Sequence, residues 1–296
     1  MTFTANSEYL VGGGRRGVFV WRAHNGEQSA TMNAWDVHCL AVSKDCRWIA
    51  AGTYGGVILW DARTYEKVLS TRADLIPIRA IDFSPDSTRL VRAESLFTVT
   101  IYDVPAGREV QTLRYLDSLG PGGLIVAVKY SPQGERIAAA TENAVHVWDS
   151  NDGRLLISIK MQVSPWRRNR ANDLLWFNNN IFVMSTDHKI KQIDASTGAV
   201  VSEWPITKDC SHIAMPHQTL IAYVAHDNDN VMFWDTSAHT HRHLIQTPKF
   251  IQSTAFSSDG QLLAIAAQLS GKITIKPLLS YIFVGFMYSS ISAELN

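Results

Sequence analysis

The sequence lacks several features that would assign the chain to a particular class of protein. Its 27 Lys and Arg residues balance its 27 Asp and Glu residues, so the formal net charge is zero. This balance argues against a broad field for binding nucleic acid or a membrane surface. The chain has three cysteines and no Cys-x-x-Cys spacing, at Cys39, Cys46 and Cys210. This indicates reduced thiols rather than disulfides or a zinc site, and we expect a cytoplasmic or nuclear protein.

Targeting and catalytic motifs are also missing. The first 14 residues have neither a basic start nor a long apolar run, so no signal peptide is predicted. The sequence contains no Gly-x-Ser-x-Gly motif and no paired carboxylates or Cys/His pair in a recognisable context. Residues 12–17 are rich in glycine, but a P-loop requires Gly-Lys-Ser/Thr ahead of a helix. We interpret this stretch as a turn between two strands, and we predict neither enzymatic activity nor a cofactor.

What the sequence does contain is an internal repeat, clearest in residues 130–153. This copy has a Ser-Pro-x-Gly turn, a strand of small residues, a strand that ends in Trp148-Asp149, and a turn that ends at Gly153. The residue that closes this third strand recurs at intervals of roughly 40 to 45 residues, at Trp21, Trp60, Tyr102, Trp148, Ile193, Trp234 and Ile275. A second landmark precedes the first turn of each copy, at Phe3, Val42, Phe83, Tyr130, Phe177, Met215 and Phe256.

A repeat of this length with four short strands and a Trp-Asp pair is typical of a β-propeller blade. The chain resembles the WD40 repeat family through Trp60-Asp61, Trp148-Asp149 and Trp234-Asp235, with Tyr102-Asp103 and Ile193-Asp194 as variants. Its turns are similar to those in the C-terminal WD40 arrays of multidomain scaffold and signalling proteins. The resemblance implies an all-β, seven-bladed propeller.

The chain departs from the family pattern at two positions of the repeat. No copy carries the Gly-His pair expected before the first strand. The Asp expected before the third strand is clear only at Asp187, with Glu142 and Asn228 as substitutes. The buried polar network of the family is therefore complete in no blade, and we expect the blades to depend more on apolar packing.

The repeat predicts one domain, residues 1–276, because each blade buries its faces only against its neighbours. The first blade is expected to be incomplete, since Phe3 already ends its innermost strand, and ring closure is expected to be imperfect. Residues 277–296 form an apolar tail that we predict to supply one further strand. That strand would complete blade seven or occupy the vacant innermost position of blade one. A membrane anchor is disfavoured by its marginal length and its serines.

Three stretches suggest ligands but favour simpler interpretations. Residues 226–230 alternate Asp and Asn, yet they lack the Gly and Glu of an EF-hand loop. His239, His241 and His243 would share one strand face and could hold a metal. We predict no metal there, because polar residues are expected on an outermost strand. Asp194 to Gly198 with Trp204 is similar to the docking motif of quinoprotein propellers, but the spacing is too long.

We predict a scaffold that binds other proteins or peptides, as a monomer or within a larger assembly. In WD40 proteins, partners commonly meet the face formed by the turns between strands two and three and by the links between blades. Aromatic and Arg residues are enriched at binding hot spots. On that face lie Arg15 and the candidate binding residues Trp35, Tyr54, Tyr115, Trp166, Arg167, Arg168 and His188. The alternatives are a quinoprotein-like or lactonase-like enzyme, or a fragment of a larger protein without independent function.

Overall fold

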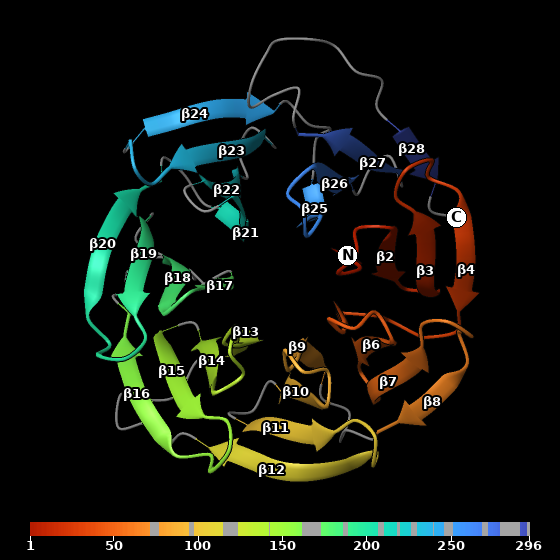
Figure 1. Ribbon diagram of the computed structural model, residues 1–296, viewed down its shortest axis with the longest axis horizontal. Helices are drawn as coiled ribbons and strands as arrows, with labels where there is room; N and C mark the ends of the chain where they lie inside the picture. The colour runs from red at the N-terminus through yellow and green to blue at the C-terminus, as the bar shows by residue number, and fades with distance from the viewer. Residues whose placement is uncertain are drawn as a thin grey trace. The chain divides into compact units, whose positions relative to one another are not determined.

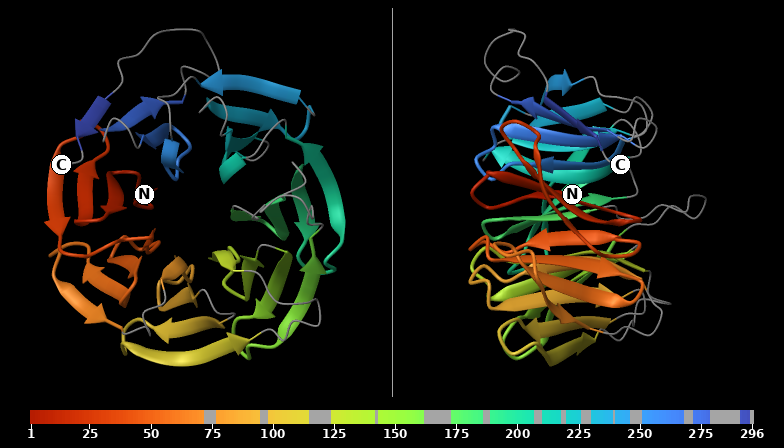
Figure 2. Two further views of the ribbon diagram at one scale, coloured as in Figure 1. Left: turned by 180° about the vertical axis from the view of Figure 1, so that it is seen from behind. Right: turned by 90° about the vertical axis from the view of Figure 1, so that its right-hand side faces the viewer.

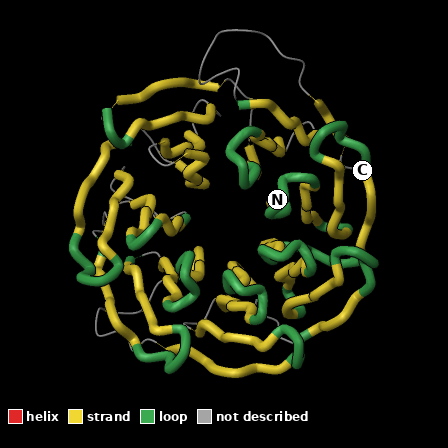
Figure 3. Tube along the Cα trace, in the orientation of Figure 1, coloured by secondary structure: helices red, strands yellow, loops and turns green. Residues whose placement is uncertain are grey.

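The structure is a computed structural model of the 296-residue chain. It describes residues 1–71, 77–94, 98–114, 124–141, 143–161, 173–185, 189–206, 210–217, 220–225, 230–238, 240–245, 251–267, 272–278 and 291–294. At a few positions within these strands only the backbone is described. The described residues form no helix (Figure 3). Accordingly, this part of the chain has no helix that is long and apolar enough to cross a membrane.

The strands form seven four-stranded sheets, and each sheet is one blade of a seven-bladed β-propeller. The predicted all-β propeller is therefore confirmed. Within each blade, consecutive strands pair antiparallel, so neighbours in sequence are neighbours in the sheet. The fourth strand, such as β12 or β16, lies on the outer side of its unit (Figure 1). Each described strand belongs to a single blade (Figure 2).

The chain divides into two compact units, and unit 1 comprises residues 1–12, 18–32 and 207–296. It holds most of blade one and all of blades six and seven. The strands of blade one are β1 (Thr2–Phe3), β2 (Tyr9–Gly14), β3 (Gly17–Arg22) and β4 (Gln28–Met32). Those of blades six and seven are β21 (Cys210–His217), β22 (Leu220–Ala225), β23 (Asn230–Asp235), β24 (Thr240–Ile245), β25 (Ile251–Phe256), β26 (Leu262–Ala267), β27 (Lys272–Pro277) and β28 (Ile291–Glu294).

Unit 2 comprises residues 13–17 and 33–206, and it holds blades two to five together with the tip of the β2–β3 hairpin. The strands of blades two and three are β5 (Cys39–Val42), β6 (Trp48–Thr53), β7 (Gly56–Asp61), β8 (Lys67–Ser70), β9 (Ile78–Phe83), β10 (Arg89–Glu94), β11 (Thr98–Asp103) and β12 (Arg108–Arg114). Those of blades four and five are β13 (Ile125–Tyr130), β14 (Arg136–Thr141), β15 (Ala144–Asp149), β16 (Leu155–Lys160), β17 (Leu174–Phe177), β18 (Asn180–Ser185), β19 (Lys189–Asp194) and β20 (Val200–Pro205).

The Asp of the Trp-Asp pair shapes the turn between the third and fourth strands. In blade four, Asp149 Oδ1 accepts hydrogen bonds from the N–H groups of Asn151 and Asp152. The N–H of Gly153 donates to the carbonyl of Asp149 at 3.1 Å. Gly153 has a φ of +73°, in the left-handed region that favours glycine. Asp61, Asp194 and Asp235 accept the same pair of N–H bonds in their own blades.

The turn between the first and second strands is built around a serine. The hydroxyl of Ser84 donates to Asp86 and accepts the N–H of Arg89. Ser257 and Asp259 repeat this arrangement in blade seven. The pKa values of Asp86 and Asp259 are lowered. Burial acts to raise them, but the hydrogen bonds from the serine hydroxyl and from main-chain N–H groups outweigh it.

The core lies between neighbouring blades rather than within them. The second strand of each well-formed blade is rich in small, fully buried residues, such as Ala50 and Ala51 of β6 and Ala138 to Ala140 of β14. These small side chains let the next blade approach closely. One cluster joins blades three and four through Val91, Leu113 and Trp148. Similar clusters join blades two and three, four and five, six and seven, and seven and one.

Blade one meets blade seven within unit 1. Strand β1 is only two residues long, as the position of Phe3 predicts. Phe3 and Trp21 nevertheless share a buried cluster with Ile275, and the amino group of Met1 donates to Ser253 Oγ at 3.1 Å. Strand β28 pairs with β27 as the fourth strand of blade seven. Residues 279–290 of the apolar tail lie outside the described residues. The position of these residues and the imperfect closure of the ring therefore stay predictions.

Replacing Gly153 by Ala is expected to lower the free energy of unfolding by about 2–3 kcal/mol. A Cβ there would sit at positive φ, with the amide of Gln111 as its nearest neighbour and Leu113 Cδ2 at 2.9 Å. Gly107 is a matched control, because it has a φ of +63° but its Cβ would lie 3.4 Å from the nearest atom, on Leu69. Gly107→Ala should cost only about 1 kcal/mol. Equal losses in denaturant titrations of the two variants would contradict the steric part of this argument.

Lowering the pH should destabilise the fold through Asp86 and Asp259. Because their folded pKa values lie below the usual value, their hydrogen bonds stabilise the fold above that value and are lost as the pH falls through about 4 and below. Ser84→Ala removes one donor and should make the fall in unfolding free energy between about pH 5 and pH 3 shallower. Ser29→Ala, on exposed strand β4, should leave the slope unchanged, and an unchanged slope in Ser84→Ala would refute the assignment.

Candidate functional site

Three loops of blades one and two are joined by main-chain hydrogen bonds within unit 2. The link between these blades, residues 33–38, lies against the tip of the β2–β3 hairpin. The N–H of Val37 donates to the carbonyl of Gly14, and the N–H of Asp36 to the carbonyl of Arg15, both at 3.2 Å. On its other side, the N–H of His38 donates to the carbonyl of Gly52 at 2.9 Å. The link is therefore held at both edges.

Trp35 stands on this link with 81% of its surface exposed. It is the most exposed large hydrophobic residue in the described part of the chain. The next residue, Asp36, has a φ of +54°, a tight bend of the backbone that Asp tolerates better than most residues. Exposing an indole to water is unfavourable, so this position does not serve the core.

Tyr54 lies in the neighbouring turn, between β6 and β7, and is 47% exposed. Thr53 fixes that turn, because its hydroxyl accepts the N–H of Gly55 at 3.1 Å and donates to the carbonyl of Gly56 at 3.0 Å. The rings of His38 and Tyr54 meet edge to face, with centroids 4.8 Å apart. His38 Nε2 lies 3.8 Å from Asp36 Oδ2. The link and the turn therefore form one continuous surface.

A buried polar network lies next to this turn. Thr71 follows β8, and its Oγ1 accepts the N–H of Val57 at 3.0 Å and a guanidinium N–H of Arg92 at 3.2 Å. Arg92 is buried, and its Nη2 lies 2.6 Å from Glu94 Oε1. Its guanidinium also lies 4.8 Å above the ring of Tyr102. These contacts tie blade two, through the strand that follows the Tyr54 turn, to blade three.

The structure brings together three of the residues that the sequence placed on this face, namely Arg15, Trp35 and Tyr54. Tyr115, Trp166, Arg167, Arg168 and His188 lie outside the described residues, so their location stays a prediction. The sequence reasoning missed His38 and Arg16, which belong to the same surface. His38 was detectable in principle, since it lies on a blade link, but nothing in the sequence indicates that its ring meets Tyr54.

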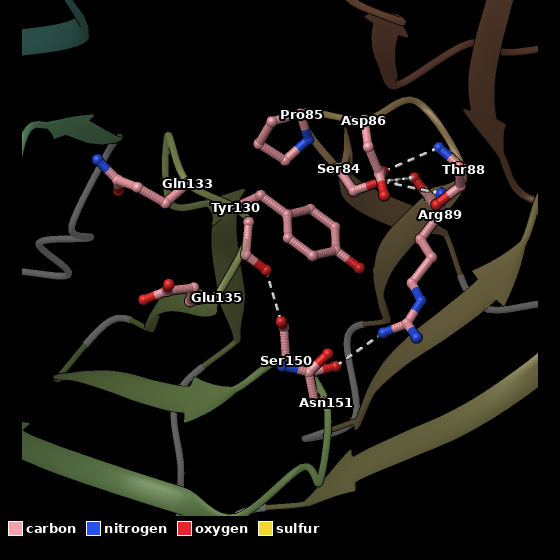
Figure 4. A pocket seen from close by; sticks show the side chains of 11 residues that line it. Ser84, Pro85, Asp86, Thr88, Arg89, Tyr130, Gln133, Glu135, Ser150 and Asn151 are labelled. Atoms are coloured by element: carbon pink, nitrogen blue, oxygen red, sulfur yellow. Dashed lines mark hydrogen bonds between the residues drawn. The ribbon is translucent and has the colours of Figure 1, made fainter.

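A polar crevice of about 290 Å³ lies between blades three and four. Tyr130 contributes its ring from the end of β13 and reaches toward the turn that contains Ser84 and Arg89 (Figure 4). Arg89 Nη1 donates to the carbonyl of Ser150 at 3.1 Å and links the two blades. Burial raises the pKa of Tyr130, so its hydroxyl stays neutral. Only 5% of Tyr130 is exposed, and its hydroxyl has no hydrogen-bond partner among the described residues.

A second crevice occupies the same position in unit 1, between blades seven and one, with a volume of about 510 Å³. It is lined by Ser7, Glu8, Tyr9, Arg22, Ala23, His24, Asp259, Gln261 and Leu262. Most residues that line the second crevice occupy positions of the repeat that also line the first, with Leu262 in place of Arg89, and Tyr9 and Arg22 are the exceptions. The recurrence indicates that the crevice is a property of the junction between blades rather than a specialised site.

The described residues offer little support for a catalytic centre. They contain no group of three or more His, Cys, Asp or Glu side chains placed to hold a metal. On the innermost strands of unit 2, Lys129 pairs with Asp82 at 3.1 Å, and the other Asp82 oxygen accepts the N–H of Tyr130. Burial raises the pKa of the Cys39 thiol to about 12, which makes it a poor nucleophile. His239 and the side chains of His241 and His243 lie outside the described part.

Comparison with known proteins agrees with the class that the fold defines, a seven-bladed β-propeller. The family model "WD domain, G-beta repeat" matches residues 26–61. The β-propeller domain of Cps50 (Swd1) from Myceliophteria thermophila is similar over 93% of this chain and 95% of its own, with a TM-score of 0.80 and 17% identity. A chain of the mitotic checkpoint complex has a TM-score of 0.76 and 19% identity, over 90% of this chain and 82% of its own. The match of one repeat to this family model, together with the propeller fold, supports a WD40 repeat protein.

Two curated relatives are similar in sequence over part of their length. The serine-threonine kinase receptor-associated protein of Dictyostelium discoideum is 24% identical over 132 residues, which is 44% of this chain and 42% of the relative. The WD repeat-containing protein SL1-17 of Schistosoma mansoni is 29% identical over 144 residues, 47% of this chain and 46% of the relative. The matched region covers less than half the length of each relative.

Replacing Tyr130 by Phe should raise the free energy of unfolding by about 1 kcal/mol, because it removes a buried hydroxyl without a partner. Phe83 and Phe256 occupy the corresponding position in blades three and seven. Phe83→Tyr is the reciprocal control and should destabilise the fold by a similar amount. Denaturant titration measures both changes. A loss of stability in Tyr130→Phe would show that the hydroxyl is satisfied in solution.

Proposed function

We propose that the chain is a protein-interaction scaffold that binds partner proteins through the surface formed by Arg15, Trp35, His38 and Tyr54. WD40 propellers typically act as scaffolds for protein interactions. The single observation that carries the assignment to this surface is the exposure of Trp35, at 81%, on a link held by hydrogen bonds at both edges. A large aromatic side chain that is exposed and pre-positioned is the residue type most enriched at hot spots.

Rigidity of the link adds to the argument. A binding loop that is ordered before the partner arrives loses less conformational entropy on binding. The hydrogen bonds from Asp36, Val37 and His38 restrict the three residues that follow Trp35, and the Thr53 cap restricts the neighbouring turn. Tyr54 adds a second aromatic ring whose edge-to-face contact with His38 limits its rotation. The surface is thus suited to bind without a large rearrangement.

An enzymatic function has less support. WD40 propellers are generally non-enzymatic interaction proteins. In the described residues, Asp82 pairs with Lys129 at 3.1 Å and also accepts the N–H of Tyr130, so both of its oxygens have a partner. The proposal therefore assigns binding, and not catalysis, to this chain.

Replacing Trp35 by Ala is expected to weaken the binding of a mapped partner by about tenfold or more, as for a typical hot-spot residue. Tyr54→Ala should weaken it less, since Tyr54 is about half exposed. Neither variant should shift the thermal unfolding midpoint by more than a few degrees, because neither side chain belongs to a buried cluster.

Val110→Ala provides a matched control, since Val110 is 49% exposed on the outer strand β12. This substitution removes exposed apolar surface from the outer strand of blade three, away from the Trp35 link, and should leave the affinity for the partner unchanged. Partner affinity can be measured by calorimetry with the purified chain. If Trp35→Ala, Tyr54→Ala and Trp166→Ala all retain the affinity of the unsubstituted chain, the assignment of this face is wrong.

A further inference from the structure

We infer that the partner segment at this surface is an acidic peptide with one large apolar side chain, a refinement that rests on the proposed function. In the complex, the apolar side chain would pack against the Trp35 indole. The carboxylates of the peptide would pair with Arg15 and Arg16 at the tip of the β2–β3 hairpin. The inference follows from the charges and contacts around Trp35.

The two arginines are adjacent to Trp35 and available to a ligand. Both side chains are exposed, and the main-chain bond between Arg15 and Asp36 places the hairpin tip beside the link. Among the ion pairs of the described residues, none includes Arg15 or Arg16. Each guanidinium therefore retains the N–H groups that bind a carboxylate in bidentate fashion.

Among the described residues of this surface, the carboxylate of the link already has a neighbour. Asp36 is the carboxylate of the link, and its Oδ2 faces His38 at 3.8 Å. In blade three, Glu94 is paired with the buried Arg92 at 2.6 Å. Two arginines without an ion-pair partner thus face solvent beside one carboxylate, which already has the His38 imidazole as a neighbour. The local charge complements an anionic segment, although the whole chain is neutral.

The size of the basic patch favours a peptide over nucleic acid. Nucleic-acid grooves carry Lys and Arg along a length that tracks several phosphates. Here the described surface offers two neighbouring arginines beside two aromatic rings, which matches the mixed aromatic and Arg composition of protein interfaces. An acidic segment with an aromatic or aliphatic side chain could pair its carboxylates with the arginines and pack that side chain against the aromatic rings.

The test is selection of a random-sequence peptide library displayed on phage against the purified chain. Enriched peptides should be acidic around an aromatic or aliphatic residue. A synthetic enriched peptide should bind Trp35→Ala and the double variant Arg15→Glu/Arg16→Glu about tenfold more weakly, measured by fluorescence anisotropy. Binding should also weaken as ionic strength rises from about 0.01 M to about 0.15 M, because the Debye length falls from about 30 Å to about 8 Å.

The control is Arg63→Glu/Arg108→Glu, which makes the same change of charge at two exposed arginines, one in the turn between β7 and β8 and one at the start of β12. It should leave affinity within about twofold, as expected for charges away from the interface. Thermal unfolding of every variant confirms that the fold is retained.

The outcomes separate this inference from the proposed function. Enriched peptides that depend on Trp35 but are neutral or basic would contradict the inference of an acidic partner. Peptides that bind Arg15→Glu/Arg16→Glu with unchanged affinity would also contradict it. In both cases the proposed scaffold function would still hold. A mixed-sequence single-stranded oligonucleotide is added as a competitor. If it displaces the peptide at Trp35 and binds more tightly than the peptide, the ligand is nucleic acid and the inference of an acidic peptide is wrong. A library that yields no peptide sensitive to Trp35→Ala or Tyr54→Ala overturns both proposals.

Discussion

The close approach of neighbouring blades is the contact on which the rest of this molecule depends. A four-stranded sheet has two faces, and each is buried only when another blade covers it. Small residues such as Ala50 and Ala139 bring the sheets together, and large ones such as Trp148 fill the space between them. Because this packing is spread over every pair of neighbours within each unit, no single loop is needed to hold a blade in place. The loops are then free to carry other chemistry.

The turns at the two ends of the strands illustrate this division. At one end, the hydrogen bonds of Ser84 and Asp149 fix turns that recur in several blades, so these positions are constrained by architecture. At the other end, Thr53 fixes the turn that carries Tyr54 as Thr141 fixes the matching turn of blade four. The link that carries Trp35 and this turn are also joined through His38. Their backbone is fixed by contacts particular to blades one and two, such as the bond from Val37 to Gly14. A rigid backbone with variable side chains is what a binding surface requires.

The sequence predicted the fold well because its landmarks are caused by local chemistry. Asp149 recurs since it caps a turn, and Trp148 recurs since it fills a junction between blades, so both leave a periodic signal. The register shift between Val147 and Trp148 in the β15–β16 pairing, found at the corresponding position in blades one to six, leaves no such signal. The site was only partly predictable. Trp35 and Tyr54 could be placed on one face, but the contact of His38 with Tyr54 depends on tertiary geometry.

The buried Arg92 connects the stability of the blades to the proposed binding surface. A buried guanidinium is tolerated only when its hydrogen bonds and charge are compensated, and here Glu94 and Thr71 supply most of that compensation. Thr71 also accepts the N–H of Val57, in the strand that follows the Tyr54 turn. Any movement of that turn large enough to displace Val57 would therefore disturb the environment of a buried charge. The cost of such a disturbance keeps Tyr54, and through it His38 and the Trp35 link, in one arrangement.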